Sequence, residues 1–132
     1  MPEGQLLQLD EYRRKSACFV IVGYQPSAGA LGGVGRLLLA SRDGARLVYV
    51  GEVRGELSRD DAIALRWMMD RLIVPAPAVD LARKRVRWLT PALVADIFFL
   101  GWTEDGKLRR ASFKGLREEA DEASVYEGRF SS

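Results

Sequence analysis

Three apolar stretches in the first half of the chain have the pattern of β-strands. Residues 17–24 form a nearly continuous apolar run, which is typical of a strand buried on both faces. Residues 36–41 and 46–53 are also rich in aliphatic side chains, and Arg42-Asp43-Gly44 between them has the composition of a tight turn. The pattern therefore predicts a central strand followed by a β-hairpin.

The middle of the chain has the spacing of an amphipathic helix. Ser58 is a good N-cap, and acidic residues follow it in the first turn, where the helix dipole favours negative charge. The apolar residues that share one helical face are Leu65, Met68, Met69 and Leu72. Because Pro75 and Pro77 cannot continue a helix, we expect it to span about residues 59–73.

The stretch from residue 86 to 119 returns to a period of two. A short basic strand, VRWL, is expected to stop at Thr90-Pro91, and residues 93–100 then alternate between two apolar faces, as in a buried strand. Glu104-Asp105-Gly106 supplies turn chemistry. Residues 107–117 follow as a second strand with several cations, so we expect a hairpin with one strongly basic arm.

Composition limits the chemistry available to the chain. Its 132 residues are enough for one domain, no apolar run is long enough to span a membrane, and the first 15 residues lack the apolar core of a signal peptide. The absence of histidine excludes Ser-His and Cys-His nucleophiles. Cys18, the one cysteine, begins an apolar run and is expected to be a small core residue in a cytoplasmic protein.

The net charge of +2 hides an uneven distribution. Residues 118–132 hold five acidic residues and one basic residue, which leaves 19 bases and 13 acids in the rest of the chain. A surplus of this kind suits a polyanionic partner.

The second half of the chain resembles a known family. The segment RWLTPALVADIFFLGWTEDGKLRRASFKGLREE is similar to the end of the C-terminal OB-fold domain of bacterial ATP-dependent DNA ligases, especially the ligase module used in end joining. Earlier segments follow the same family, so that the resemblance runs from about Phe19 to Glu119. The positions in family register near the end of the chain are Trp88, Pro91, Leu93, Val94, Trp102, Thr103, Asp105, Gly106, Leu108, Arg109, Phe113, Gly115, Leu116 and Arg117.

The resemblance implies a fold and a division of the chain. The expected fold is mainly β, a five-stranded OB-fold Greek-key barrel with one helix between strands three and four. Residues 1–16 would be a lead-in, residues 17–119 the OB-fold domain and residues 120–132 an acidic flexible tail.

Several features of the family's chemistry are missing. The complete family uses ATP and Mg²⁺ and forms an adenylated lysine in a K-x-D-G motif, whereas none of the four lysines here is followed by x-D-G. The family's motif VI ends Arg-x-Asp-Lys, and this chain has Arg117-Glu118-Glu119-Ala120. Glu52 stands at a position that is basic in the family. We therefore expect no catalytic residue, no metal ligand and no cofactor in this chain, and no self-adenylation.

What remains is a set of cations suited to a nucleic-acid backbone. Arg117 is a remnant of the nucleotide-phosphate motif. The predicted DNA-binding residues are Arg83, Lys84, Arg85, Arg87, Lys107, Arg109, Arg110 and Lys114. The resemblance implies contact with duplex or nicked DNA without reading of the bases.

The expected partner is duplex or nicked DNA, with a nucleotidyltransferase domain or a repair protein as a further expected partner, no membrane partner and a monomeric state. One alternative is an interaction module that docks or activates a repair ligase, which would present an exposed apolar patch. Another is a binder of single-stranded nucleic acid, which needs exposed aromatic residues. Phe113 is the convincing candidate for that role, because Trp88 and Trp102 lie in apolar strands and are expected to be core residues.

Overall fold

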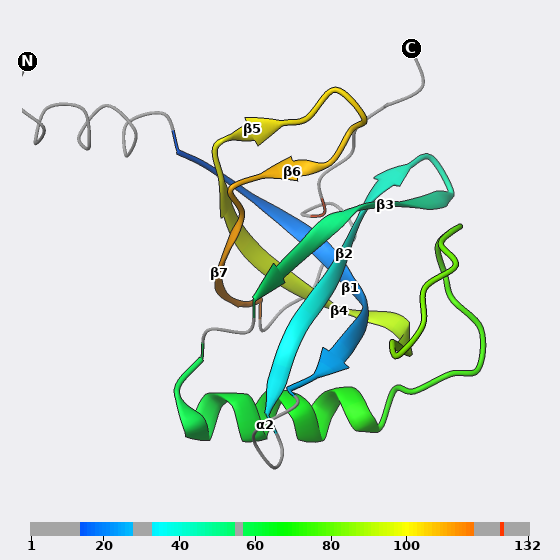
Figure 1. Cartoon of the computed structure of the whole chain (residues 1–132), viewed down its shortest axis with the longest axis vertical. Helices are drawn as coiled ribbons and strands as arrows, with labels where there is room; N and C mark the ends of the chain where they lie inside the picture. Colours follow the sequence, from blue (N-terminus) through cyan, green and yellow to red (C-terminus); the bar gives the residue numbers. More distant parts are fainter. Residues whose placement is uncertain (1–13, 28–32, 55–56, 118–124, 126–132) are drawn as a thin grey trace, which may run out of the picture.

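A five-stranded antiparallel sheet and one helix make up most of the fold (Figure 1). The computed structural model describes residues 14–27, 33–54, 57–117 and 125. The strand order is β3-β2-β1-β4-β7, and β5 and β6 form a separate two-stranded ladder. The elements are β1 (Lys15–Pro26), β2 (Val34–Asp43), β3 (Arg46–Arg54), α2 (Arg59–Asp70), β4 (Arg87–Phe99), β5 (Gly101–Trp102), β6 (Leu108–Arg109) and β7 (Ser112–Leu116). The mainly β fold with one helix between the third and fourth strands is confirmed.

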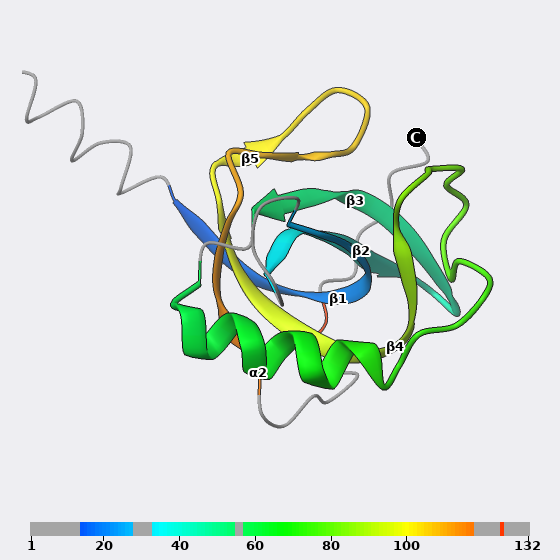
Figure 2. The same ribbon diagram turned by 60° about the horizontal axis from the view of Figure 1, so that its bottom comes forward.

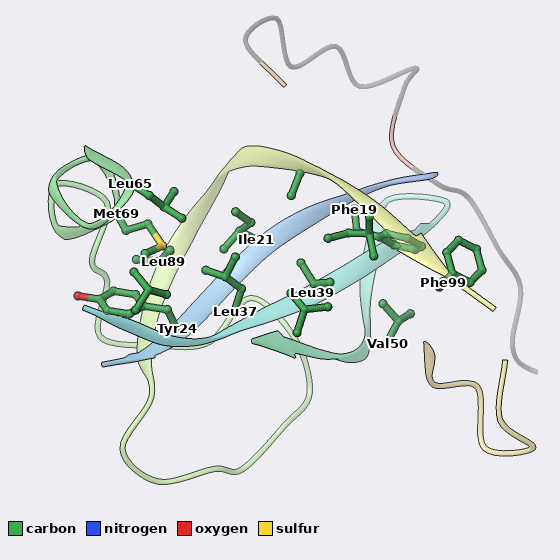
Figure 3. Close-up of a cluster of buried hydrophobic side chains, with 14 residues drawn as sticks. Phe19, Ile21, Tyr24, Leu37, Leu39, Val50, Leu65, Met69, Leu89 and Phe99 are labelled. Carbon is green, nitrogen blue, oxygen red and sulfur yellow. The ribbon is translucent and has the colours of Figure 1, made fainter. Parts of the chain in front are cut away.

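The curled sheet encloses the main core, and α2 lies across one end of it (Figures 1 and 2). Figure 3 shows Leu65 and Met69 of the helix beside Tyr24 and Leu89 at this end. The aromatic rings of Phe19, Phe99 and Trp102 pack edge to face toward the other end. The predicted amphipathic face of the helix is therefore the face that closes the core.

A second apolar cluster covers the outer side of the same sheet. Val20 and Val22 of β1 point away from the main core and pack with Leu38 of β2. Val79 and partly buried Leu81, from the irregular segment between α2 and β4, cover them. Strand β1 is therefore buried on both faces, as the continuous apolar run predicts.

The helix ends three residues earlier than the sequence predicts. Ser58 caps its start, since the side-chain hydroxyl accepts a hydrogen bond from the Asp61 amide. Its end is at Asp70, because the next residues pair with the start of β4: Val74 donates to the carbonyl of Trp88, and Thr90 donates to the carbonyl of Leu72. Competition from this strand pairing, and not the later prolines, ends the helix.

Two further boundaries differ from the prediction. Thr90-Pro91 does not end a strand, because β4 runs through it from Arg87 to Phe99. The register with β1 jumps from Ile21 opposite Leu93 to Gly23 opposite Trp88, so Pro91 lies in a bulge, where its missing N–H costs no ladder bond.

The predicted single strand over residues 107–117 is two strands. Arg110, with φ of 51°, separates β6 from β7. Strand β6 pairs with β5, whereas β7 pairs with β4. The basic arm expected from the sequence therefore bends into two differently directed pieces.

A bulge in β3 decides which of its side chains face outward. The turn between β2 and β3 is the two-residue Gly44-Ala45, and the ladder runs regularly from there to Ala40 opposite Tyr49. Leu39 then pairs with Gly51, which has φ of 122°, so Val50 is the extra residue. Beyond the bulge, the register of β3 against β2 is therefore shifted by one residue.

Strands β3 and β7 are the two edges of the bonded sheet, and they lie against each other. The ladders of the described residues do not join them, so closure of the barrel by hydrogen bonds stays a prediction. The tail predicted from residue 120 onward falls outside the described residues except for Val125, which is buried and forms a parallel bridge with Cys18.

The buried status of β1 can be tested with two isoleucines. Ile21 is fully buried, whereas Ile63 on the outer side of α2 is 48% exposed. We expect Ile21→Ala to lower the free energy of unfolding by about 2–5 kcal/mol, because it leaves a cavity in the core. The control Ile63→Ala should change it by less than about 0.5 kcal/mol. Urea denaturation of both variants measures this; equal losses would contradict the core assignment.

Candidate nucleic-acid interface

Arg83 is held against the outer face of β3 by a carboxylate. Its Nη2 lies 2.7 Å from Oε2 of Glu52, in a charge pair and not an aligned hydrogen bond. Arg83 also donates 3.4 Å hydrogen bonds to the hydroxyl of Tyr49 and to the side chain of Gln25. Burial and the nearby Glu52 raise the pKa of Tyr49. A ligand that engages Arg83 must compete with these contacts.

Lys107 also reaches this tyrosine. Its Nζ lies 5.8 Å from the centre of the Tyr49 ring, in a cation–π contact, and donates to the carbonyl of Asp105. The structure therefore brings Arg83 and Lys107 together around one aromatic ring, although 24 positions separate them in the sequence.

Arg87 lies apart from this pair, at the end of the sheet covered by α2. Its Nη1 donates to the hydroxyl of Tyr24 at 2.9 Å and lies 3.6 Å from Oδ1 of Asp70. The Tyr24 hydroxyl donates to Asp70, and Arg66 pairs with the same carboxylate. Burial and the Asp70 hydrogen bond raise the pKa of Tyr24. Arg87 thus belongs to a network that ties β1, β4 and α2 together.

Lys114 and Arg117 lie on the outer side of β7 and β4. The Nζ of Lys114 is 5.0 Å from the centre of the Phe98 ring, which Arg14 approaches to 3.9 Å. The Nε of Arg117 is 3.4 Å from Oδ1 of Asp96. The remnant of the nucleotide-phosphate motif is therefore paired with a carboxylate of the neighbouring strand.

Four predicted DNA-binding residues remain. Lys84 and Arg85 lie on the irregular segment before β4, and Arg109 and Arg110 lie at the end of the β5–β6 ladder. All four are exposed, and none has an acidic partner among the described residues. Within the described part of the chain, an anion can therefore meet these four cations without first breaking an ion pair.

The outer face of an OB-fold sheet is a common site for oligonucleotides. Here the segment between α2 and β4 occupies part of that face: Val79, Leu81 and Val86 pack over β1 and β2, and Trp88 packs with them. Trp102 packs against the main core. Both tryptophans, predicted to be core residues, are partly buried and pack against the apolar clusters.

Asp96 also accepts a hydrogen bond from the thiol of Cys18 at 2.7 Å. Burial, followed by this contact with Asp96, raises the pKa of the thiol from 9.0 to about 11. Cys18 is 7% exposed, so the prediction of a small core residue is confirmed. Within the described residues, no cluster of three or more His, Cys, Asp and Glu could hold a metal ion.

Three residues on the outer face of β2 and β3 are not predicted from the sequence. Glu52, expected only as a lost basic position, pairs with both Arg36 and Arg83. Arg36 and Arg54 are directly opposite each other in the ladder. The signal that could have revealed this is Gly51, because a glycine inside a strand often marks a bulge.

The raised pKa of Cys18 predicts a loss of stability in alkali. Between about pH 9 and 11 the unfolded chain releases the thiol proton while the folded chain keeps it, so stability falls as pH rises through this window. We expect the thiol to account for a loss of about 1–2 kcal/mol by about pH 10. Urea unfolding of the protein and of Cys18→Ser at rising pH measures this loss. Both proteins contain the same titrating tyrosines, so the difference between them reports the thiol. Identical pH profiles would contradict the assigned shift.

Comparison with known proteins agrees with the architecture. The family model described as the ATP dependent DNA ligase C terminal region matches residues 30–120. The chain is 33% identical over 114 residues to the multifunctional non-homologous end joining DNA repair protein LigD of Mycobacterium tuberculosis, covering 80% of this chain and 15% of that protein. It is 32% identical over 109 residues to the LigD protein of Pseudomonas aeruginosa, covering 76% of this chain and 13% of that protein.

Two solved structures are similar to the whole sheet. The crystal structure of the ligase domain from M. tuberculosis LigD superposes with a TM-score of 0.79 at 28% identity and covers 88% of this chain and 39% of that chain. A mycobacterial DNA ligase D complexed with ATP and MES gives a TM-score of 0.74, also at 28% identity, and covers 86% of this chain and 38% of that chain. The chain thus spans less than half of either solved structure. No helix in the described part of the chain is long and apolar enough to cross a membrane.

Proposed function

Because the chain belongs to the family of C-terminal regions of ATP-dependent DNA ligases, we propose that it binds the backbone of duplex or nicked DNA during strand joining. The observation that carries this proposal is a group of exposed cations that have neither an acidic partner nor an aromatic contact among the described residues: Lys84, Arg85, Arg109 and Arg110. Lysine and arginine gain affinity from phosphates by releasing condensed counterions, without reading the bases.

The ion pairs in the structure divide the predicted DNA-binding residues into two groups. Arg83 and Arg87 are already paired with Glu52 and Asp70, so a DNA phosphate gains less from them. Lys84 and Arg85 have no acidic partner among the described residues, so a DNA phosphate has no ion pair to break there. We propose that the unpaired group supplies most of the affinity, with a dissociation constant of about 10⁻⁴–10⁻⁶ M at physiological salt.

The proposal leaves the chemical step to a nucleotidyltransferase domain. ATP and Mg²⁺ belong to the complete ligase family, and this chain lacks the K-x-D-G lysine. The role we propose for the domain is to hold the DNA while another domain joins it.

A second candidate function has one observation in its favour. Ile63 and Trp67 on α2 are 48% and 62% exposed, and Ile73 after the helix is 47% exposed. An exposed apolar group of this kind is typical of a protein-docking face. The partner we propose for it is the nucleotidyltransferase domain, since this chain covers 39% of the solved ligase domain. The single-stranded binder has less support, because Phe113 packs against the core.

The salt dependence of DNA binding tests the leading proposal. We expect Lys84→Ala/Arg85→Ala to weaken binding to nicked and intact duplexes alike and to flatten the slope of log affinity against log salt by about two units. Arg83→Ala should flatten it by much less than one unit, because Glu52 already neutralises that guanidinium.

The control is Arg59→Ala/Arg71→Ala on α2, which removes the same charge from another part of the surface. Fluorescence anisotropy over a salt series measures all variants. An unchanged slope in Lys84→Ala/Arg85→Ala would remove the support for the DNA-backbone role and favour the docking face.

A further inference from the structure

A polar cavity lies between the two edge strands of the sheet, at what we call the seam between β3 and β7. Its volume is about 330 Å³. Arg36, Glu52 and Arg54 contribute from β2 and β3, and Ala111, Ser112 and Phe113 contribute from the β7 side. The cavity opens between β3 and β7, which are the two edge strands of the hydrogen-bonded sheet and lie far apart in the sequence.

Two arginines at the seam face each other across the ladder. Arg36 of β2 and Arg54 of β3 are direct partners in register. Like charges that are directly opposite in a sheet repel each other. Arg54 is exposed and has no acidic partner among the described residues, so nothing described there offsets this repulsion at its guanidinium.

Among the described residues that line the cavity, Glu52 is the one carboxylate, and two arginines share it. Its Oε1 lies 2.9 Å from Nη1 of Arg36, and its Oε2 lies 2.7 Å from Nη2 of Arg83. Two guanidiniums therefore share one carboxylate, and Arg54 adds a third positive charge to the lining of the cavity. The excess positive charge, the cavity and the opposed arginines together have the chemistry of an anion-binding site.

We propose that the seam binds a phosphate group, held by the guanidiniums of Arg54 and Arg36 and by the hydroxyl of Ser112. Arginine matches phosphate oxygens in a bidentate geometry, and two opposed arginines can share one phosphate. Glu52 acts as an internal competitor, since the phosphate must draw Arg36 away from it.

The phosphate has two possible sources, a DNA backbone or free pyrophosphate. The assignment rests on the proposed function only where the source is DNA. Free pyrophosphate probes the site directly, so the seam can be tested without reference to DNA.

The experiment titrates the full chain with inorganic pyrophosphate by isothermal calorimetry at low salt. We expect Arg54→Ala to weaken binding by about tenfold, because it removes a charged donor from the site. Glu52→Gln should tighten binding by about threefold, because it releases Arg36 while keeping the shape of the side chain. The control Arg46→Ala, at the other end of β3, should leave binding unchanged.

Thermal unfolding of each variant verifies that it is folded. Equal pyrophosphate affinities for Arg54→Ala and Arg46→Ala would overturn the site, as would weaker binding in Glu52→Gln. The same variants are then titrated with nicked duplex. If the variants rank in the same order for nicked duplex as for pyrophosphate, the seam binds a backbone phosphate. If the substitutions change only pyrophosphate binding, the seam binds a free ligand. Pyrophosphate binding without any DNA binding by the unmodified chain would support the seam and contradict the proposed function.

Discussion

The burial of β1 on both faces is the constraint on which the rest of the structure depends. Its inner side chains, Phe19 and Ile21, need the curled sheet and α2 to exclude water. Its outer side chains, Val20 and Val22, need a second cover, and the segment between α2 and β4 provides it. That segment also carries the basic residues before β4. The apolar requirement of one strand therefore places cations beside the outer face of β3.

The bulge at Val50 and Gly51 then decides how those cations are neutralised. Without the extra residue, Tyr49 and Glu52 would lie on opposite faces of β3, since side chains alternate along a strand. With it, both reach Arg83 on the outer face. The bulge also sets Arg36 opposite Arg54. A local change of register thus produces both the contacts that hold Arg83 on β3 and the excess of positive charge at the seam.

Sequence patterns predict those features of the fold that depend on neighbouring residues. The period of two over residues 93–100 gives the buried part of β4, and the helical spacing of Leu65 and Met69 gives the face of α2 that covers the core. The helix end, the continuity of β4 through Pro91 and the break at Arg110 depend on pairing with distant strands, so local propensity missed them. The ion pairs were missed for the same reason: Glu52 and Arg83 are 31 positions apart. A basic composition alone does not distinguish a free cation from a paired one.

Mapping amide chemical shifts during titration with a nicked duplex tests the central claim most directly. The account predicts that exposed cations without carboxylate partners contact the DNA backbone, whereas Arg87 and Arg117, held by Asp70 and Asp96, do not. The largest shifts should fall on residues 84–85 and 109–110. Shifts confined to α2 around Ile63 and Trp67, with the basic segments unchanged, would contradict it.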